Sequence, residues 1–272
     1  MAPNARNDAG PLVYRQSGWT RITHWIWAIC LFFLMLTGLQ IFNAHPTLHI
    51  GIESGFDYDN AVLEIGARQQ GADVVGITRV FGHEFDTTGF LGVSAGEVRA
   101  FPAALTIPST RNLATGRVIH FFFAWILVGT LLTWLVASAI NGHLRRDLAI
   151  GGRDIRALPA DIAAHARLRF HHGRSYNVLQ KLAYVGVLFG LLPMMILTGL
   201  TMSPGFNATA PWLLDLFGGR QTARSLHFII MLALIGFFVI HMLMILAAGP
   251  LNELRSIITG WYRIGAGSDE EN

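Results

Sequence analysis

The sequence predicts an all-α integral membrane protein, a bundle of four transmembrane helices, and two observations support this fold class. Hydrophobic residues make up 52% of the 272 residues and charged residues only 14%, which is too apolar for an ordinary soluble domain of this size. Four stretches are apolar and long enough to cross a bilayer: about 22–43, 118–140, 178–202 and 226–248. A spanning segment must satisfy its own backbone hydrogen bonds, so each stretch is expected to be helical.

The first stretch is too long for the core of a cleavable signal peptide, and its start is marked by Arg21 and His24, which such a segment would not need. We therefore expect it to be retained. It also holds Cys30, the only cysteine, so the chain by itself cannot form an internal disulfide or ligate an iron–sulfur cluster with four thiolates. In the third stretch, Pro193 removes one backbone hydrogen bond and is expected to kink the helix.

The connections between the stretches predict the orientation of the chain. The 141–177 connection carries seven arginines against three aspartates, which places it and both termini in the cytoplasm by the positive-inside rule. The 44–116 connection is acidic and glycine-rich, so it is expected on the opposite, periplasmic face. Its length favours a docking surface for a partner over disorder. We treat 1–272 as a single membrane domain.

Histidines within the apolar stretches are costly to bury and are therefore functional candidates. Four are present: His24, His120, His227 and His241. The last two are fourteen residues apart, so they return to within about 40° of one helix face, roughly 21 Å apart. Depth in the membrane pairs His120 with His227 on the periplasmic side and His24 with His241 on the cytoplasmic side. Each pair could hold one haem iron, and two imidazoles leave no open coordination position, which suits electron transfer.

Arginine precedes three of these histidines by three residues, a spacing that puts both side chains on one helix face. These arginines are Arg21, Arg117 and Arg224. Each could pair with a haem propionate while its histidine reaches the iron. The alternative is that interfacial arginines simply mark helix ends, but the threefold recurrence favours the propionates.

A short internal repeat is also visible. The sequence Leu-Thr-Gly-Leu occurs at 36–39 and again at 197–200, near the outer ends of the first and third stretches. Gly38 and Gly199 could each pack against a flat cofactor, or they could simply allow close helix packing. Outside the helices, His45 and His49 could share a helical face as a metal site, but no companion carboxylate or thiolate pattern supports one.

On these residues the sequence resembles the di-haem cytochrome b subunits of thiosulfate reductases, respiratory formate dehydrogenases and membrane-bound nickel–iron hydrogenases. The thiosulfate reductase branch is the most similar. The resemblance covers all four helices and rests on one histidine in the first, one in the second and the pair fourteen apart in the fourth. It implies the same two pairings of haem b, and a quinone (ubiquinone or menaquinone) beside the cytoplasmic haem, at the start of the third helix.

The start of the third helix contains Tyr-Asn-Val-Leu-Gln-Lys at 176–181, which is similar to the family's Tyr-Asn-x-x-Gln-Lys element. By that resemblance Asn177 and Gln180 would contact the quinone. Protonatable or donor groups open to the cytoplasm lie close by in sequence: His171, His172 and Arg174. Without the resemblance, the same residues could form an ordinary polar helix cap.

The sequence therefore predicts a quinone-reacting electron-transfer subunit of an oxidoreductase complex in the bacterial inner membrane. The resemblance favours a periplasmic molybdopterin oxidoreductase as the partner, directly or through an iron–sulfur subunit, or else a cytochrome c, docked on the 44–116 loop. One alternative is a stand-alone haem b quinol oxidoreductase that reduces superoxide or ferric iron. Another is a haem-free transporter whose histidines relay protons. Nucleic acid is not an expected partner, and the net charge is only +3.

Overall fold

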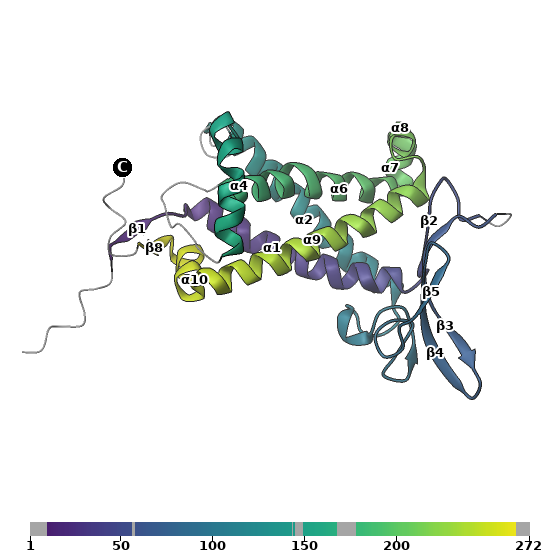
Figure 1. Cartoon of the computed structure of the whole chain (residues 1–272). Helices are drawn as coiled ribbons and strands as arrows, with labels where there is room; N and C mark the ends of the chain where they lie inside the picture. The colour runs from purple at the N-terminus through teal and green to yellow at the C-terminus, as the bar shows by residue number, and fades with distance from the viewer. Residues whose placement is uncertain (1–9, 56–57, 143, 145–148, 168–177, 265–272) are drawn as a thin grey trace, which may run out of the picture. The chain divides into compact units, whose positions relative to one another are not determined.

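The computed structural model describes residues 10–55, 58–142, 144, 149–167 and 178–264 (Figure 1). Four helical spans are long and apolar enough to cross a membrane: α1 (Gly18–Phe42), α2 (Leu113–Ile140), the span Val178–Thr201 and α9 (Arg220–Ala248). The prediction of four membrane helices is confirmed. Three of them begin four to six residues before the predicted position, because their first residues are too polar to register as apolar stretches.

The third span is not a uniform α-helix. It consists of α5 (Val178–Val185), the π-helical segment η2 (Gly186–Leu191) and α6 (Leu192–Thr201). Pro193 follows the π segment directly. Proline has no N–H, and its ring clashes with the carbonyl four residues earlier, so a regular α-helix is disfavoured there. The irregularity expected at Pro193 is therefore present as a π-helical segment.

The chain forms two compact units. Unit 1 comprises Met1–Ile26, Thr130–Leu191 and Leu234–Asn272, and unit 2 comprises Trp27–Gly129 and Leu192–Ala233. Each of the four spans contributes residues to both units, so the division does not follow the order of the sequence.

Unit 1 joins segments near the two ends of the chain. Strand β1 (Leu12–Tyr14) pairs antiparallel with β8 (Trp261–Arg263). Helix α10 (Pro250–Thr259) leads into β8 through Gly260, whose φ is +90°. A side chain at that position would collide with the ring of Tyr14, 2.6 Å from the place of a Cβ, so the turn requires glycine.

A further helix of unit 1, α4 (Gly152–Ala166), contacts the start of the third span. Lys181 Nζ lies 3.1 Å from Asp154 Oδ1. Asp161 Oδ2 accepts a hydrogen bond from the backbone N–H of Val178 at 3.0 Å, which satisfies one donor at the N-terminus of α5. These contacts fix where the third span begins.

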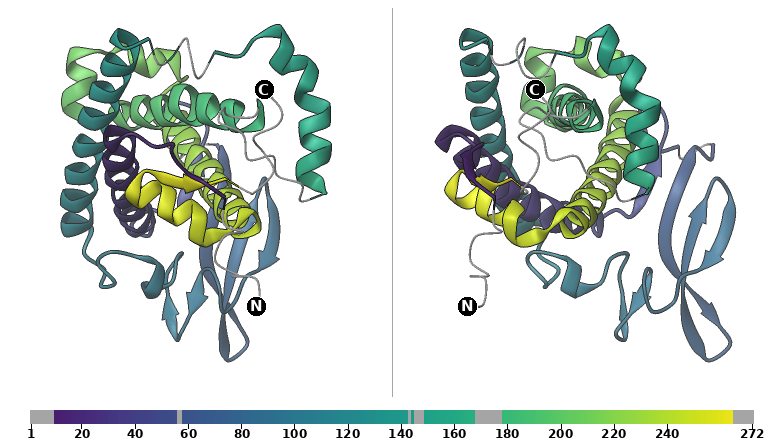
Figure 2. Two further views of the ribbon diagram at one scale, coloured as in Figure 1. Left: turned by 90° about the vertical axis from the view of Figure 1, so that its left-hand side faces the viewer. Right: turned by 60° about the vertical axis from the view of Figure 1, so that its left-hand side comes forward.

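In unit 2, the connection between α1 and α2 is folded into strands (Figures 1 and 2). The main sheet has four antiparallel strands in the order β2 (Thr47–His49), β3 (Ala61–Gln70), β4 (Asp73–Val80) and β5 (His83–Asp86). A short hairpin, β6 (Val93–Ser94) and β7 (Glu97–Val98), and the 3₁₀ turn η1 (Ala103–Leu105) follow. The all-α prediction missed these strands, and the described part of this segment is folded rather than disordered.

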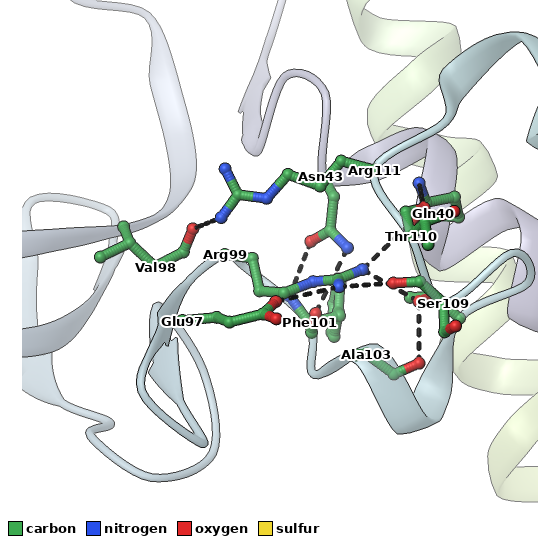
Figure 3. Close-up of polar contacts among 11 residues, drawn as sticks. Gln40, Asn43, Glu97, Val98, Arg99, Phe101, Ala103, Ser109, Thr110 and Arg111 are labelled. Carbon is green, nitrogen blue, oxygen red and sulfur yellow. Dashed lines mark hydrogen bonds and ion pairs between the residues drawn. The ribbon is translucent and has the colours of Figure 1, made fainter.

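Buried polar contacts tie this segment to the end of α1 (Figure 3). The Arg99 side chain is 3% exposed, and it donates to Gln40 Oε1 at 3.0 Å and to the carbonyl of Ser109 at 2.8 Å. Asn43 exchanges two hydrogen bonds with the backbone of Phe101, at 2.7 and 3.3 Å. Because unpaired buried groups are costly, these bonds specify the position of the segment on α1.

An apolar cluster lies beneath the sheet. Phe42 at the end of α1 packs with Leu48, Ile65 and Ala100, all of which are buried. Phe228 of α9 joins this cluster, with its ring centroid 4.7 Å from that of Phe42. The sheet therefore rests on both α1 and α9 within unit 2, next to the turn of α9 that carries His227.

Candidate metal centres

In unit 1 the structure brings His24 of α1 and His241 of α9 together, with ring centroids 6.4 Å apart. A metal bond of about 2 Å to each imidazole would fit within this separation, so the two rings could hold one metal ion. His24 Nδ1 is buried and has no hydrogen-bond partner among the described residues. An unpaired buried group costs roughly 1–3 kcal/mol, so this ring is suited to a further bound group. We call these two residues the inner pair.

In unit 2 the corresponding residues are His120 of α2 and His227 of α9. Each ring is held by a threonine from another helix. His120 Nδ1 lies 2.9 Å from Thr37 Oγ1 of α1, and His227 Nδ1 lies 3.0 Å from Thr198 Oγ1 of α6. Both threonines are fully buried. We call the two histidines the outer pair.

The predicted packing glycines lie against the same two rings. A Cβ on Gly38 would stand 3.6 Å from His120 Cε1, and one on Gly199 would stand 3.3 Å from His227 Cε1. The repeated Thr-Gly sequence therefore gives each outer histidine two contacts: a threonine hydroxyl, and the backbone of a glycine that has no side chain. The sequence pointed to the glycines but not to the threonines, although each threonine directly precedes its glycine.

The three predicted propionate arginines differ in their contacts. Arg21 Nη1 donates to the carbonyl of Ile258 at 2.6 Å. Arg224 Nη1 donates to the carbonyl of Thr47 at 2.8 Å and thereby holds the start of the sheet. The side chain of Arg117 is exposed. Two of these residues thus bind neighbouring backbone, and their role toward propionates stays a prediction.

Most of the predicted quinone site falls in the part of the chain that the structure leaves undescribed. The residues concerned are His171, His172, Arg174 and Asn177. Gln180 is described and lies in α5, next to Lys181, whose ammonium group pairs with Asp154 of α4. The quinone assignment remains a prediction for all five residues.

Two further histidines meet beside Arg224. The rings of His45 and His49 have centroids 5.8 Å apart, and Arg224 Nη1 lies 3.2 Å from His45 Nδ1. His49 is buried, and Ser225 Oγ of α9 donates to its backbone carbonyl at 2.7 Å. Burial, and then the neighbouring His45 and Arg224, hold the pKa of His49 below its ordinary value. Among the described residues, no three His, Cys, Asp or Glu side chains are placed to share a metal ion.

A sequence profile described as prokaryotic cytochrome b561 matches residues 15–260. The chain belongs to the prokaryotic cytochrome b561 family. Together with the four apolar helices, this makes it a multi-pass membrane protein of the cytochrome b class, for which b-type haem is implied. The predicted resemblance to membrane cytochrome b subunits is thereby confirmed.

Two relatives illustrate what this cytochrome b561 family member is similar to. One is a provisionally named protein-methionine-sulfoxide reductase subunit, YedZ1, of Azospira oryzae; it is 24% identical over 229 residues, which cover 84% of this chain and 87% of the relative. The other is a provisionally named cytochrome, YdhU, of Escherichia coli K12; it is 34% identical over 96 residues, covering 32% and 33% of the two chains. No solved structure gives a significant match.

Proposed function

We propose that this cytochrome b561 family member is a di-haem electron-transfer subunit of the bacterial inner membrane. It passes electrons between a quinone at the cytoplasmic face and a redox partner at the periplasmic face. The observation that carries the proposal is the division of the intramembrane histidines into an inner pair and an outer pair. The rings of His24 and His241, 6.4 Å apart, would together hold one iron.

Each part of the chain has a distinct role in this proposal. His24 and His241 would hold the cytoplasmic-side haem b, and His120 and His227 the periplasmic-side haem b. Bound haem supplies a one-electron centre, and two imidazoles per iron leave no position for oxygen. The arginine-rich 141–177 connection, on the cytoplasmic side, and Gln180 at the start of the third span would provide the quinone contacts. The same region would exchange the two protons that accompany reduction of the quinone by two electrons.

The folded sheet favours a subunit with a partner over a stand-alone quinol oxidoreductase. Phe81, Phe85 and Phe90 are large apolar residues of this segment, and all three are exposed. Exposed apolar side chains are expected where a partner docks. One relative is named as a subunit of a protein-methionine-sulfoxide reductase. We therefore favour a periplasmic reductase, a molybdopterin enzyme by the family resemblance, whose own cofactor performs the substrate chemistry.

The experiment that tests the proposal is a haem count on the purified membrane protein. The alkaline pyridine haemochrome spectrum should give two b haems per chain. His227→Ala should leave one, because only the outer pair is broken, and His24→Ala should also leave one, by loss of the inner haem. His83→Ala, an exposed residue of β5, is the matched control and should retain both.

Three results would contradict the proposal. A wild-type chain that folds but carries fewer than two haems would exclude the two pairings, and a chain with none would favour the proton-relay alternative. Retention of the outer haem in His227→Ala, with loss of the inner one, would mean that the pairs are assigned to the wrong sides. Potentiometric titration distinguishes the two haems in each variant.

A further inference from the structure

The direction of the hydrogen bond between Thr37 and His120 can be worked out from its neighbours. Thr37 Oγ1 lies 2.6 Å from the carbonyl oxygen of Phe33 and 2.9 Å from His120 Nδ1. A carbonyl can only accept, so the single hydroxyl hydrogen of Thr37 is donated to Phe33. The threonine oxygen must then accept from the ring, which places a hydrogen on Nδ1.

A second acceptor supports this assignment. The carbonyl of Leu34 lies 3.3 Å from Thr37 Oγ1 and, like that of Phe33, can only accept. Both carbonyl oxygens beside the hydroxyl are therefore acceptors, and both belong to one turn of α1.

The same arrangement occurs independently at the other outer histidine. Thr198 Oγ1 lies 2.7 Å from the carbonyl of Met194, 3.1 Å from that of Met195 and 3.0 Å from His227 Nδ1. The acceptors stand three and four residues before each threonine in both halves, so the two sites are built alike.

We propose that Thr37 and Thr198 are the positioning residues of the outer haem. Each hydroxyl oxygen accepts the Nδ1–H of one ligand, which leaves Nε2 unprotonated and fixes the direction in which it points. A hydrogen bond of this kind also raises the basicity of the imidazole, and a more basic ligand stabilises ferric over ferrous iron. The inference rests on the proposed function, in which His120 and His227 bind that haem.

In the inner pair, one histidine lacks a hydrogen bond from its Nδ1 to a threonine hydroxyl. His24 Nδ1 has no hydrogen-bond partner within the described parts of the chain. The neighbouring Thr23 is buried, but its hydroxyl donates to the carbonyls of Trp19 and Thr20 in its own helix. The proposed effect is therefore specific to the outer haem, and the inner haem serves as an internal reference.

Substitution of the threonines by valine tests the proposal, because valine keeps the shape and removes the oxygen. Thr37→Val and Thr198→Val should each raise the midpoint potential of the outer haem and leave the inner one unchanged. We expect a shift toward the ferrous form of about tenfold, equivalent to about 59 mV for one electron. Thr37→Ser and Thr198→Ser retain the acceptor and should keep the wild-type potential. Potentiometric titration of the haem absorbance measures each value.

Thr201→Val is the matched control. Thr201 is also fully buried on α6, and its hydroxyl donates to the carbonyl of Thr198 at 2.6 Å rather than to a histidine. Its substitution removes a helix-bonded hydroxyl from the same helix and should leave both potentials unchanged. A shift in this variant as large as that in Thr198→Val would overturn the proposal.

The remaining outcomes separate this inference from the proposed function. If the wild type binds two haems and both valine variants keep them at wild-type potentials, the threonines are not positioning residues, although the di-haem function stands. If a valine variant loses the outer haem, the serine variant decides: normal haem and potential support the proposal, and renewed loss overturns it. A wild type with fewer than two haems would refute both.

Discussion

The glycines beside the outer histidines allow a quantitative prediction, because the two contacts differ in distance. Alanine in place of glycine stabilises a helix by up to about 1 kcal/mol. At Gly38 the new Cβ would stand 3.6 Å from His120 Cε1, within the range of about 3.5–4.0 Å that suits two carbon atoms. At Gly199 the distance to His227 Cε1 is 3.3 Å, so the ring would have to move by a few tenths of an ångström.

The expected outcomes therefore differ in sign. Gly38→Ala should keep the helix gain and bind both haems normally. In Gly199→Ala the overpacking of a tight site costs about 1–3 kcal/mol, which outweighs the helix stabilisation. The free energy of unfolding should therefore decrease by up to about 2 kcal/mol. If His227 holds iron as proposed, its ring cannot move freely, so binding of the outer haem should be the first property affected. The haemochrome count and thermal unfolding in detergent measure both effects, and equal behaviour of the two variants would refute the reasoning.

Two further predictions concern the sheet of unit 2. Arg99→Met should destabilise the segment by about 3 kcal/mol, because it leaves buried oxygens unpaired. Arg68→Met, which removes an exposed ion pair with Glu84, should cost less than about 1 kcal/mol. Hydrogen exchange of β3 and β4 compares the two variants, and equal protection in both would contradict the assignment. The pKa of His49 in the folded chain is lowered from its ordinary value of 6.5, so as the pH falls His49 is protonated in the unfolded chain before it is protonated in the folded one. The free energy of unfolding should therefore be highest above about pH 6.5 and decrease below it. Melting temperatures measured from pH 5 to 8 should show this slope, His49→Gln should reduce it, and exposed His83→Gln should not; an unchanged slope in His49→Gln would exclude His49 as its source.

The sequence was sufficient to predict the membrane helices and the proximity of His24 to His241. Apolar stretches of membrane length are the strongest signal that a single sequence carries, since no other environment tolerates them. The fourteen-residue spacing of His227 and His241 placed them at two depths of one helix, and the structure brings His24 to His241 as that depth predicted. These inferences needed only the regular geometry of an α-helix.

The sheet could not be predicted in the same way. Its two longest strands, β3 and β4, each contain a glycine, and glycine inside a strand normally argues against the assignment. Gly76 is such a residue within β4. A Cβ there would stand only 2.2 Å from the carbonyl oxygen of Leu91, so glycine is required by a backbone that crosses close to the strand. That requirement arises from a tertiary contact, which no local pattern in the sequence reveals.

The division of the chain has a practical consequence for studies of its stability. The inner pair lies wholly in unit 1 and the outer pair wholly in unit 2. With both haems bound, the absorbance of each haem would report whether the unit that supplies its ligands is folded. Release of one haem during a denaturant titration would then mark the local opening of that unit, while the spectrum of the other still reports a folded state. The two haems would thus serve as internal probes of the order in which the two units unfold.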